Sequence, residues 1–257
     1  MDRRAALALI TASAALPFHS VRASGAALPA AGLPPGGLYD PRNFGAKGDG
    51  KTLDSHAINA AIDACTAAGG GVVYCAPGNY LCGTVELKTN VSLYLEAGAV
   101  LLGSTDLKDY TLKAGPSPTS DAGQAHLIYA RDATHVGLLG PGRVDGQGRS
   151  YWVPSDRQPA PADKRWSEAR HSDLKPKPRV SPMVELVNCT NLRIESIELV
   201  GASGWTMRPI NCTRVSIRDI VIRNPAIGPN TDGIDLTGCQ SVVISDCVIE
   251  TGDDAIC

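Results

Sequence analysis

Aromatic residues and net charge are both scarce in this sequence of 257 residues. Phe, Trp and Tyr make up 5% of it, and 24 Lys and Arg nearly balance 26 Asp and Glu, leaving a formal net charge of −2. The sequence therefore lacks the bulk positive charge of a nucleic-acid-binding module, and we expect no nucleic-acid partner. Apart from the N-terminal stretch, no apolar run approaches the roughly 18 residues of a membrane-spanning helix.

The eight cysteines have no spacing typical of a metal site. They form neither a CxxC pair nor a Cys/His grouping with zinc spacing, so we predict no metal ligands and no cofactor. Cys75 and Cys82 are a possible local disulfide if the protein is exported. Most of the other cysteines recur at fixed positions in a repeat.

The N-terminal stretch resembles a targeting signal. Arg3 and Arg4 precede an alanine-rich apolar run, and Ala23 ends a small-residue pattern suited to signal peptidase. We therefore predict a signal peptide over residues 1–23, read by the Sec or twin-arginine pathway, and a secreted or periplasmic protein with no membrane attachment after cleavage. Residues 24–38, rich in Ala, Gly and Pro, are predicted to be a linker.

A repeat of 23 to 27 residues covers the C-terminal half. The segments 188–194, 211–217 and 238–244 align without gaps, and each alternates apolar and polar residues with the period of a β-strand. Fainter copies begin at Thr89 and Thr134. Stacked units of this kind bury like residues above one another. We therefore predict that Cys189, Cys212 and Cys239 are small hydrophobic residues of one ladder.

The repeat predicts an all-β fold, a parallel β-helix over residues 39–257. A leucine-rich repeat is excluded because its characteristic Asn is replaced by Ala202, Pro225 and Gly252 in the three copies. Residues 54–68 have one apolar face and end at three glycines, which predicts a short N-terminal capping α-helix with Asp54 or Ser55 at its start.

Residues 45–52 fit the pattern of a phosphate-binding P-loop, GxxxxGKT. That motif requires a buried strand before the loop, and Pro41 is incompatible with a central strand there. We therefore interpret this segment as a turn that leads to the capping helix.

Three carboxylates are brought together by the repeat. When Ile234 is aligned with Ile256, Asp232 falls one coil away from Asp254, and Asp253 is adjacent to both. Carboxylates this close repel one another, so at least one pKa should rise enough to hold a proton near neutral pH. A protonated acid beside ionised bases is what glycosidic cleavage requires. Ordinary turn residues and a calcium site are the alternatives.

These motifs resemble those of glycoside hydrolase family 28, the polygalacturonases and their relatives. The resemblance covers residues 40–257 and rests on NTDG at 230–233 and GDD at 252–254, supported by residues 43–52, 69–78, 95–99 and 140–148. It implies a right-handed parallel β-helix that hydrolyses α-1,4-galacturonosyl or related rhamnogalacturonan bonds of pectin, inverts the anomeric centre and uses no metal.

The resemblance also implies residue roles. Asp253 is expected to be the general acid, Asp232 and Asp254 to hold the attacking water, and Asn230 to contact the substrate, which would be an acidic polysaccharide. Arg208 stands where many members have His. The family's Gly-His-Gly and Arg-x-Lys signatures do not follow Asp254, so we expect an incomplete domain whose C-terminal coils are missing, inactive as written, with the full-length enzyme a monomer active in cell-wall pectin degradation.

Two other functions remain open. The first is a calcium-dependent pectate-type polysaccharide lyase, which would use the same architecture. The second is a non-catalytic carbohydrate-binding solenoid, which would bind sugar without turnover.

Overall fold

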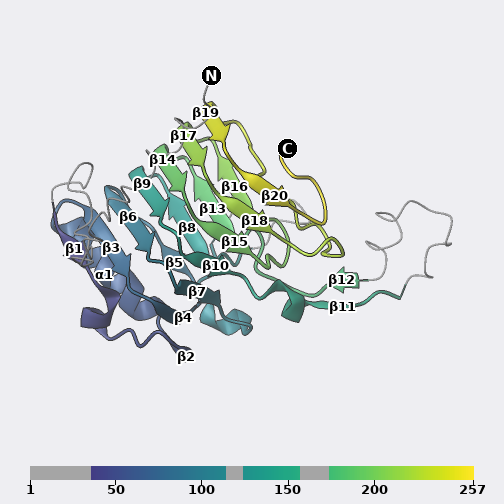
Figure 1. Ribbon diagram of the computed structural model, residues 1–257, viewed down its shortest axis with the longest axis horizontal. Coiled ribbons are helices and arrows are strands. Elements are labelled where there is room, and N and C mark those ends of the chain that lie inside the picture. Colours follow the sequence, from purple (N-terminus) through teal and green to yellow (C-terminus); the bar gives the residue numbers. More distant parts are fainter. Residues whose placement is uncertain (1–35, 114–123, 157–173) are drawn as a thin grey trace, which may run out of the picture. The chain divides into compact units, whose positions relative to one another are not determined.

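The computed structural model describes residues 36–113, 124–156 and 174–257, which form a right-handed parallel β-helix (Figure 1). Each coil contributes a strand to two or three parallel sheets, here named A, B and C. Sheet A consists, in stacking order, of β1 (Leu38–Tyr39), β3 (Gly71–Cys75), β6 (Val91–Leu95), β9 (Thr134–Leu139), β14 (Thr190–Glu195), β17 (Thr213–Arg218) and β19 (Gln240–Ser245).

Sheets B and C stack alongside sheet A. Sheet B consists of β2 (Asp49–Leu53), β4 (Gly78–Cys82), β7 (Ala99–Gly103), β10 (Arg143–Asp145), β15 (Glu198–Val200), β18 (Val221–Arg223) and β20 (Val248–Glu250). Sheet C consists of β5 (Val85–Glu86), β8 (Ile128–Arg131), β13 (Val184–Val187) and β16 (Met207–Ile210). The antiparallel pair β11 (Trp152–Pro154) and β12 (Leu174–Pro176) projects from the helix.

The positions aligned by the sequence repeat pair with one another across the strands of sheet A. Leu192 pairs with Val215, which pairs with Val242. The faint upstream copies join the same sheet, since Leu93 pairs with Leu138 and Leu138 with Ile194. Like residues therefore lie above one another on successive coils. The inward positions fill the core with Val, Ile and Leu, which is why so few aromatic residues suffice.

Five of the eight cysteines are buried in the core, Cys239 and Cys247 are half-buried, Cys257 is exposed, and all eight are free thiols. Cys189 and Cys212 are fully buried in successive coils, where the amide of Cys189 donates to Sγ of Cys212 at 3.4 Å. Cys239 continues this ladder half-buried. The possible disulfide between Cys75 and Cys82 is wrong: the two residues end strands of different sheets, and each thiol is buried separately in the core.

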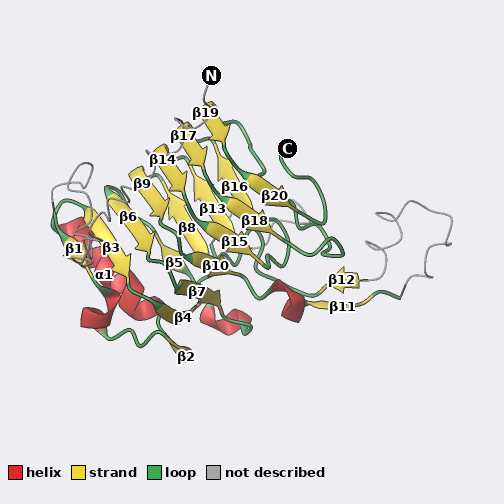
Figure 2. Cartoon of the chain, viewed as in Figure 1, coloured by secondary structure: helices red, strands yellow, loops and turns green. Residues whose placement is uncertain are grey.

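Helix α1 (Ser55–Ala67) covers the first coils, as the sequence predicts (Figure 2). It buries Ile58, Ala61, Ile62 and Cys65. Asp54 stands at the N-cap position, but its carboxylate does not cap the helix; it accepts hydrogen bonds from the amides of Lys47 at 2.7 Å and Gly48 at 2.9 Å. The P-loop-like segment therefore wraps around an internal carboxylate. Three short 3₁₀ helices complete the secondary structure: η1 (Pro41–Phe44), η2 (Leu107–Asp109) and η3 (Gly148–Tyr151).

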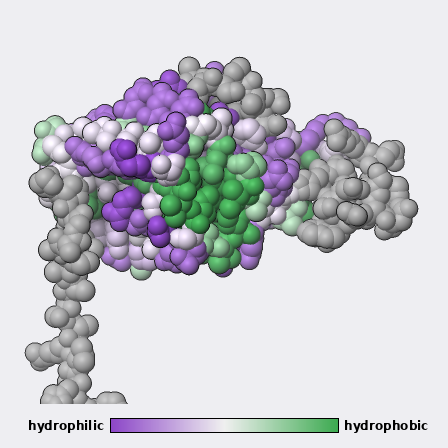
Figure 3. Space-filling model, turned by 90° about the horizontal axis from the view of Figure 1, so that it is seen from above, coloured by the Kyte–Doolittle hydropathy of each residue, from purple (hydrophilic) through white to green (hydrophobic). Residues whose placement is uncertain are grey.

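The opposite end of the solenoid exposes apolar side chains. Val243, Val248 and Ile256 are 44%, 50% and 48% exposed, and Ile244, Cys247 and Ile249 are half-buried. Figure 3 views the molecule from this side and shows an apolar area there. None of the helices in the described part of the chain is long and apolar enough to cross a membrane. The predicted signal peptide, residues 1–23, and linker residues 24–35 lie outside the described residues.

Candidate active site

Two turns on successive coils carry the predicted site residues. Residues 230–233 lie in one turn and residues 252–254 in the next, and parallel bridges join Met207 to Ile234 and Ile234 to Ile256. The amide of Gly233 donates to the carbonyl of Asp254 at 2.8 Å. The predicted alignment of Ile234 with Ile256 is therefore confirmed, and sheet C continues through both motifs.

A buried threonine holds the two turns together. Thr231, which is fully buried, donates through Oγ1 to the carbonyl of Gly228 at 3.1 Å and accepts from the amide of Gly252 at 3.0 Å. A Cβ at position 252 would lie 2.5 Å from this hydroxyl and 2.6 Å from the Gly228 carbonyl, so glycine is required there. The hydroxyl thus fixes the backbone that leads into Asp253 relative to the backbone that leads into Asp232.

The buried side chain of Asn224, directly after β18 on the same coil as residues 230–233, supports the same turns. Its Nδ2 donates to Oγ1 of Thr206 at 2.7 Å and to the carbonyl of Thr231 at 3.3 Å. Its Oδ1 accepts from the amide of Ala202 at 2.9 Å. Sequence reasoning missed Asn224 and Thr231, although Thr231 lies inside the NTDG motif.

The environments of the three carboxylates differ. Asp232 is 7% exposed, whereas Asp253 and Asp254 are exposed. Burial, then the charges of Asp235 and Asp253, raise the pKa of Asp232 to about 7. The expectation that one carboxylate of the cluster has a pKa raised toward neutral pH thus applies to Asp232.

Asn230 precedes Thr231 in a left-handed backbone conformation, with φ of 52°, and is half-buried. Asparagine tolerates this conformation better than most residues do. The neighbouring carbonyl of Pro229 accepts a hydrogen bond from Nη1 of Arg179 at 2.8 Å, and the same nitrogen donates to the carbonyl of Ser203 at 2.9 Å. Asn230 therefore lies at the rim of the turn that carries Asp232.

A cation could be held by part of this site. One ligand atom each from Asp232, Asp254 and Cys257 lie within 4.8 Å of one another. The Cys257 thiol also donates to Oδ1 of Asp235 at 2.6 Å, and burial, followed by this hydrogen bond, raises its pKa to about 12. A protonated thiol is a weak metal ligand, so two carboxylates would have to supply most of the affinity. The expectation of metal-free chemistry stays a prediction.

A row of polar residues leads to the site along the outer face of sheet C. Tyr129, Glu185 and Arg208 pair in register on β8, β13 and β16, and the bridge from Met207 to Ile234 places Asp235 next in the row. Glu185, Arg208 and Asp235 are 1%, 3% and 6% exposed. Sequence reasoning did not identify Glu185 or Asp235. The sequence signal that could have identified them is that each is a single charged residue between two apolar residues that face the core.

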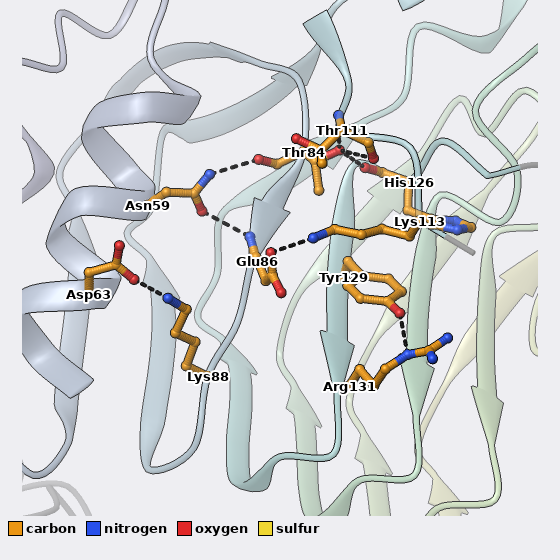
Figure 4. Close-up of polar contacts among 10 residues, drawn as sticks. All are labelled: Asn59, Asp63, Thr84, Glu86, Lys88, Thr111, Lys113, His126, Tyr129 and Arg131. Atoms are coloured by element: carbon orange, nitrogen blue, oxygen red, sulfur yellow. Dashed lines mark hydrogen bonds and ion pairs between the residues drawn. The ribbon is translucent and has the colours of Figure 1, made fainter. Parts of the chain in front are cut away.

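The row begins at β5, beside the capping helix (Figure 4). Lys113 donates to Oε2 of Glu86 at 2.6 Å, and Nε of Arg131 donates to the hydroxyl of Tyr129 at 2.6 Å. Asn59 of α1 bonds the backbone on both sides of Val85, through the Thr84 carbonyl and the Glu86 amide, each at 2.9 Å. This end of the row is therefore tied to the capping helix.

Comparisons with known proteins agree with this architecture. The model of the family described as glycosyl hydrolases family 28 matches residues 75–257. A Vitis vinifera protein named as a probable polygalacturonase is 28% identical over 225 residues, which cover 83% of this chain and 42% of that protein. A Zea mays exopolygalacturonase is 29% identical over 227 residues, which cover 86% of this chain and 49% of that protein. The chain thus spans less than half the length of these two relatives.

Among solved structures, the exopolygalacturonase from Thermotoga maritima superimposes with a TM-score of 0.70 at 25% identity, covering 86% of this chain and 54% of that one. The family match includes both motifs, residues 230–233 and 252–254. The chain belongs to glycosyl hydrolase family 28.

Proposed function

We propose that this protein hydrolyses the bonds between galacturonosyl units of pectin, in polygalacturonate or in a related rhamnogalacturonan, with inversion at the anomeric carbon. The observation that carries the proposal is the pairing of the two motif turns, which gathers Asp232, Asp253 and Asp254 at one edge of sheet C. Its relatives from Vitis vinifera and Zea mays are named as polygalacturonases, which supports the same substrate class.

In this proposal Asp253 protonates the glycosidic oxygen as the bond to C1 breaks. Asp232 and Asp254 orient a water molecule on the opposite side of the sugar ring, and one of them accepts its proton as the oxygen bonds to C1. Asp232 suits the water-holding role because it is buried and fixed by the backbone on both sides of it, through Thr231 and Gly233. Asn230, at the rim of the same turn, contacts the substrate.

The proposal includes a cellular location. An acidic polysaccharide of the cell wall is met outside the cytoplasm, which agrees with the predicted signal peptide and with a secreted or periplasmic protein. N-terminal sequencing of the exported protein tests this point, and the expected first residue is Ser24.

The test of the function is to incubate the full-length enzyme with polygalacturonate and measure both reducing ends and the ultraviolet absorbance of unsaturated uronates. Hydrolysis produces reducing ends alone, and a chelator leaves the rate unchanged. A rise in absorbance that a chelator abolishes would contradict the proposal and support a lyase, for which the convergence of Asp232 and Asp254 offers a cation site. Binding of the polymer with no cleavage would indicate a carbohydrate-binding solenoid.

A further inference from the structure

Arg208 has hydrogen-bond donors that no residue in the described part of the chain satisfies. Its side chain is 3% exposed, and its Nε and Nη2 make no hydrogen bond there. Nη2 lies 3.4 Å from Oε1 of Glu185 and forms an ion pair without hydrogen-bond geometry. A buried charged donor without an acceptor is costly, so proteins seldom keep one unless a ligand completes it.

The carboxylate of Glu185 contacts a second partner besides Arg208. Its Oε2 lies 2.9 Å from Nε2 of His126, whose Nδ1 faces the carbonyl of Pro182 at 2.9 Å. A carbonyl only accepts hydrogen bonds, so Nδ1 carries a hydrogen. The contact between Nε2 and Oε2 is close but makes no hydrogen bond, like the contact between Arg208 Nη2 and Glu185 Oε1. Glu185 therefore divides its interaction between two partners and leaves Arg208 able to bind another anion.

The other neighbours of Arg208 orient its guanidinium but accept no hydrogen bond from its Nε or Nη2. The guanidinium lies over the ring of Trp205, 5.3 Å from the centroid, which holds its plane. Asp235 is in register with Arg208 on the next coil, and burial raises the pKa of Asp235 while the charge of Arg208 opposes that rise. Oδ1 of Asp235 accepts from the Cys257 thiol, and its Oδ2 makes no hydrogen bond with any described residue, so Asp235 does not satisfy the donors of Arg208.

The surroundings explain why a cation is needed here. Asp232, Asp253, Asp254 and Asp235 gather at this end of sheet C, and they would repel a substrate that carries one carboxylate per sugar unit. Arg179, a second cation near the turn, directs Nη1 at two backbone carbonyls. The planar fork of an arginine matches a carboxylate with two parallel hydrogen bonds.

We propose that Arg208 binds the carboxylate of a uronosyl unit beside the aspartate cluster, through Nε and Nη2, and that it selects the free acid over the methyl ester. This inference rests on the proposed function. The exposed Asp253 and Asp254 open the site to solvent, and Arg208 lies deeper, on the coil before Asp232. A methyl ester at that sugar would lose the charge and one acceptor and leave the Arg208 donors unpaired.

The experiment compares trigalacturonate with its fully methyl-esterified form, using calorimetric affinity and, where turnover is measurable, kcat/KM. The variant Arg208→Gln should reduce the preference for the acid roughly 10- to 100-fold, the value of a charge-assisted hydrogen bond. Arg208→Lys should restore part of it. The control Arg218→Gln, on the exposed face of β17, should leave the preference unchanged.

Removing Arg208 leaves the buried Glu185 without its arginine partner and could prevent folding. The double variant Glu185→Gln/Arg208→Gln removes both charges, and it should fold and show the same loss of preference. An unchanged preference in a folded variant overturns the inference and leaves the proposed function intact. If the full-length wild-type enzyme neither binds nor cleaves either compound, both the inference and the proposed function are wrong.

Discussion

Replacing Asp232 by Asn should make the protein more stable at pH 8 and leave its stability nearly unchanged at pH 4. The pKa of Asp232 is about 7 in the folded state, against an ordinary value of 3.8 for an aspartate in water. Between these pH values the folded state binds a proton that the unfolded state has released. The free energy of unfolding therefore falls as pH rises from about 4 to about 7, and above pH 7 the folded protein carries a buried charge.

The size of the stability change follows from the difference between the pKa values of Asp232 in the folded and unfolded states. Each pH unit between 3.8 and about 7 is worth about 1.4 kcal/mol, which gives a destabilisation on the order of 4 kcal/mol at pH 8. Asn has nearly the same shape and no charge, and Oδ1 of Asp232 has no hydrogen-bond partner among the described residues that the substitution would break. Asp235, whose pKa burial also raises, keeps part of the pH dependence in the variant. The expected gain at pH 8 is therefore about 2–4 kcal/mol.

Urea unfolding at pH 4, 6 and 8 measures this difference directly. Asp246→Asn is the matched control, because Asp246 is an exposed carboxylate in a turn, and this variant should follow the wild-type curve. If Asp232→Asn is no more stable than the wild type at pH 8, the assignment of the high pKa to Asp232 is refuted. A gain would mean that the site retains a destabilising charge for its function.

Two further substitutions test how the site and the first coils are held. Thr231→Val keeps the shape of the side chain but leaves the Gly252 amide and the Gly228 carbonyl unpaired, so urea unfolding should show a loss of about 2–4 kcal/mol. The control Thr190→Val, at a half-buried strand position, should change the free energy of unfolding by less than about 0.5 kcal/mol. Equal losses in the two variants would contradict the role of the Thr231 hydroxyl. Ile62→Ala opens a cavity beneath α1 and should cost about 2–5 kcal/mol in the same assay, and a loss below about 1 kcal/mol would show that the helix does not cover the core.

The sequence predicts most of the fold because the β-helix repeats its residues coil by coil. Aligning Leu192, Val215 and Val242 gives the register of sheet A, and aligning Ile234 with Ile256 gives the pairing of the two motif turns. In both cases the same residue type marks the same place in each coil, so a local comparison of letters supplies a contact between distant residues.

The contacts that the sequence does not predict join residues that differ from one coil to the next. His126, Glu185 and Arg208 interact across coils, and a strand pattern gives the face of each side chain but not its partner. Asp54 is similar, since its position suits a helix cap while its carboxylate binds amides of a loop that precedes it. Such polar contacts depend on the tertiary arrangement and have no local signature.

The central claim is that the aspartate cluster cleaves glycosidic bonds with Asp253 as the acid. The most direct measurement is the rate of reducing-end release from polygalacturonate by the Asp253→Asn variant of the full-length enzyme beside the wild type, with urea unfolding to confirm that the variant folds. The exposed position of Asp253 predicts a normal fold, and loss of a positioned acid predicts a rate lower by roughly 10²- to 10⁴-fold. A folded variant that retains more than about 10% of the wild-type rate would contradict the claim, since general acid catalysis is worth at least about 100-fold.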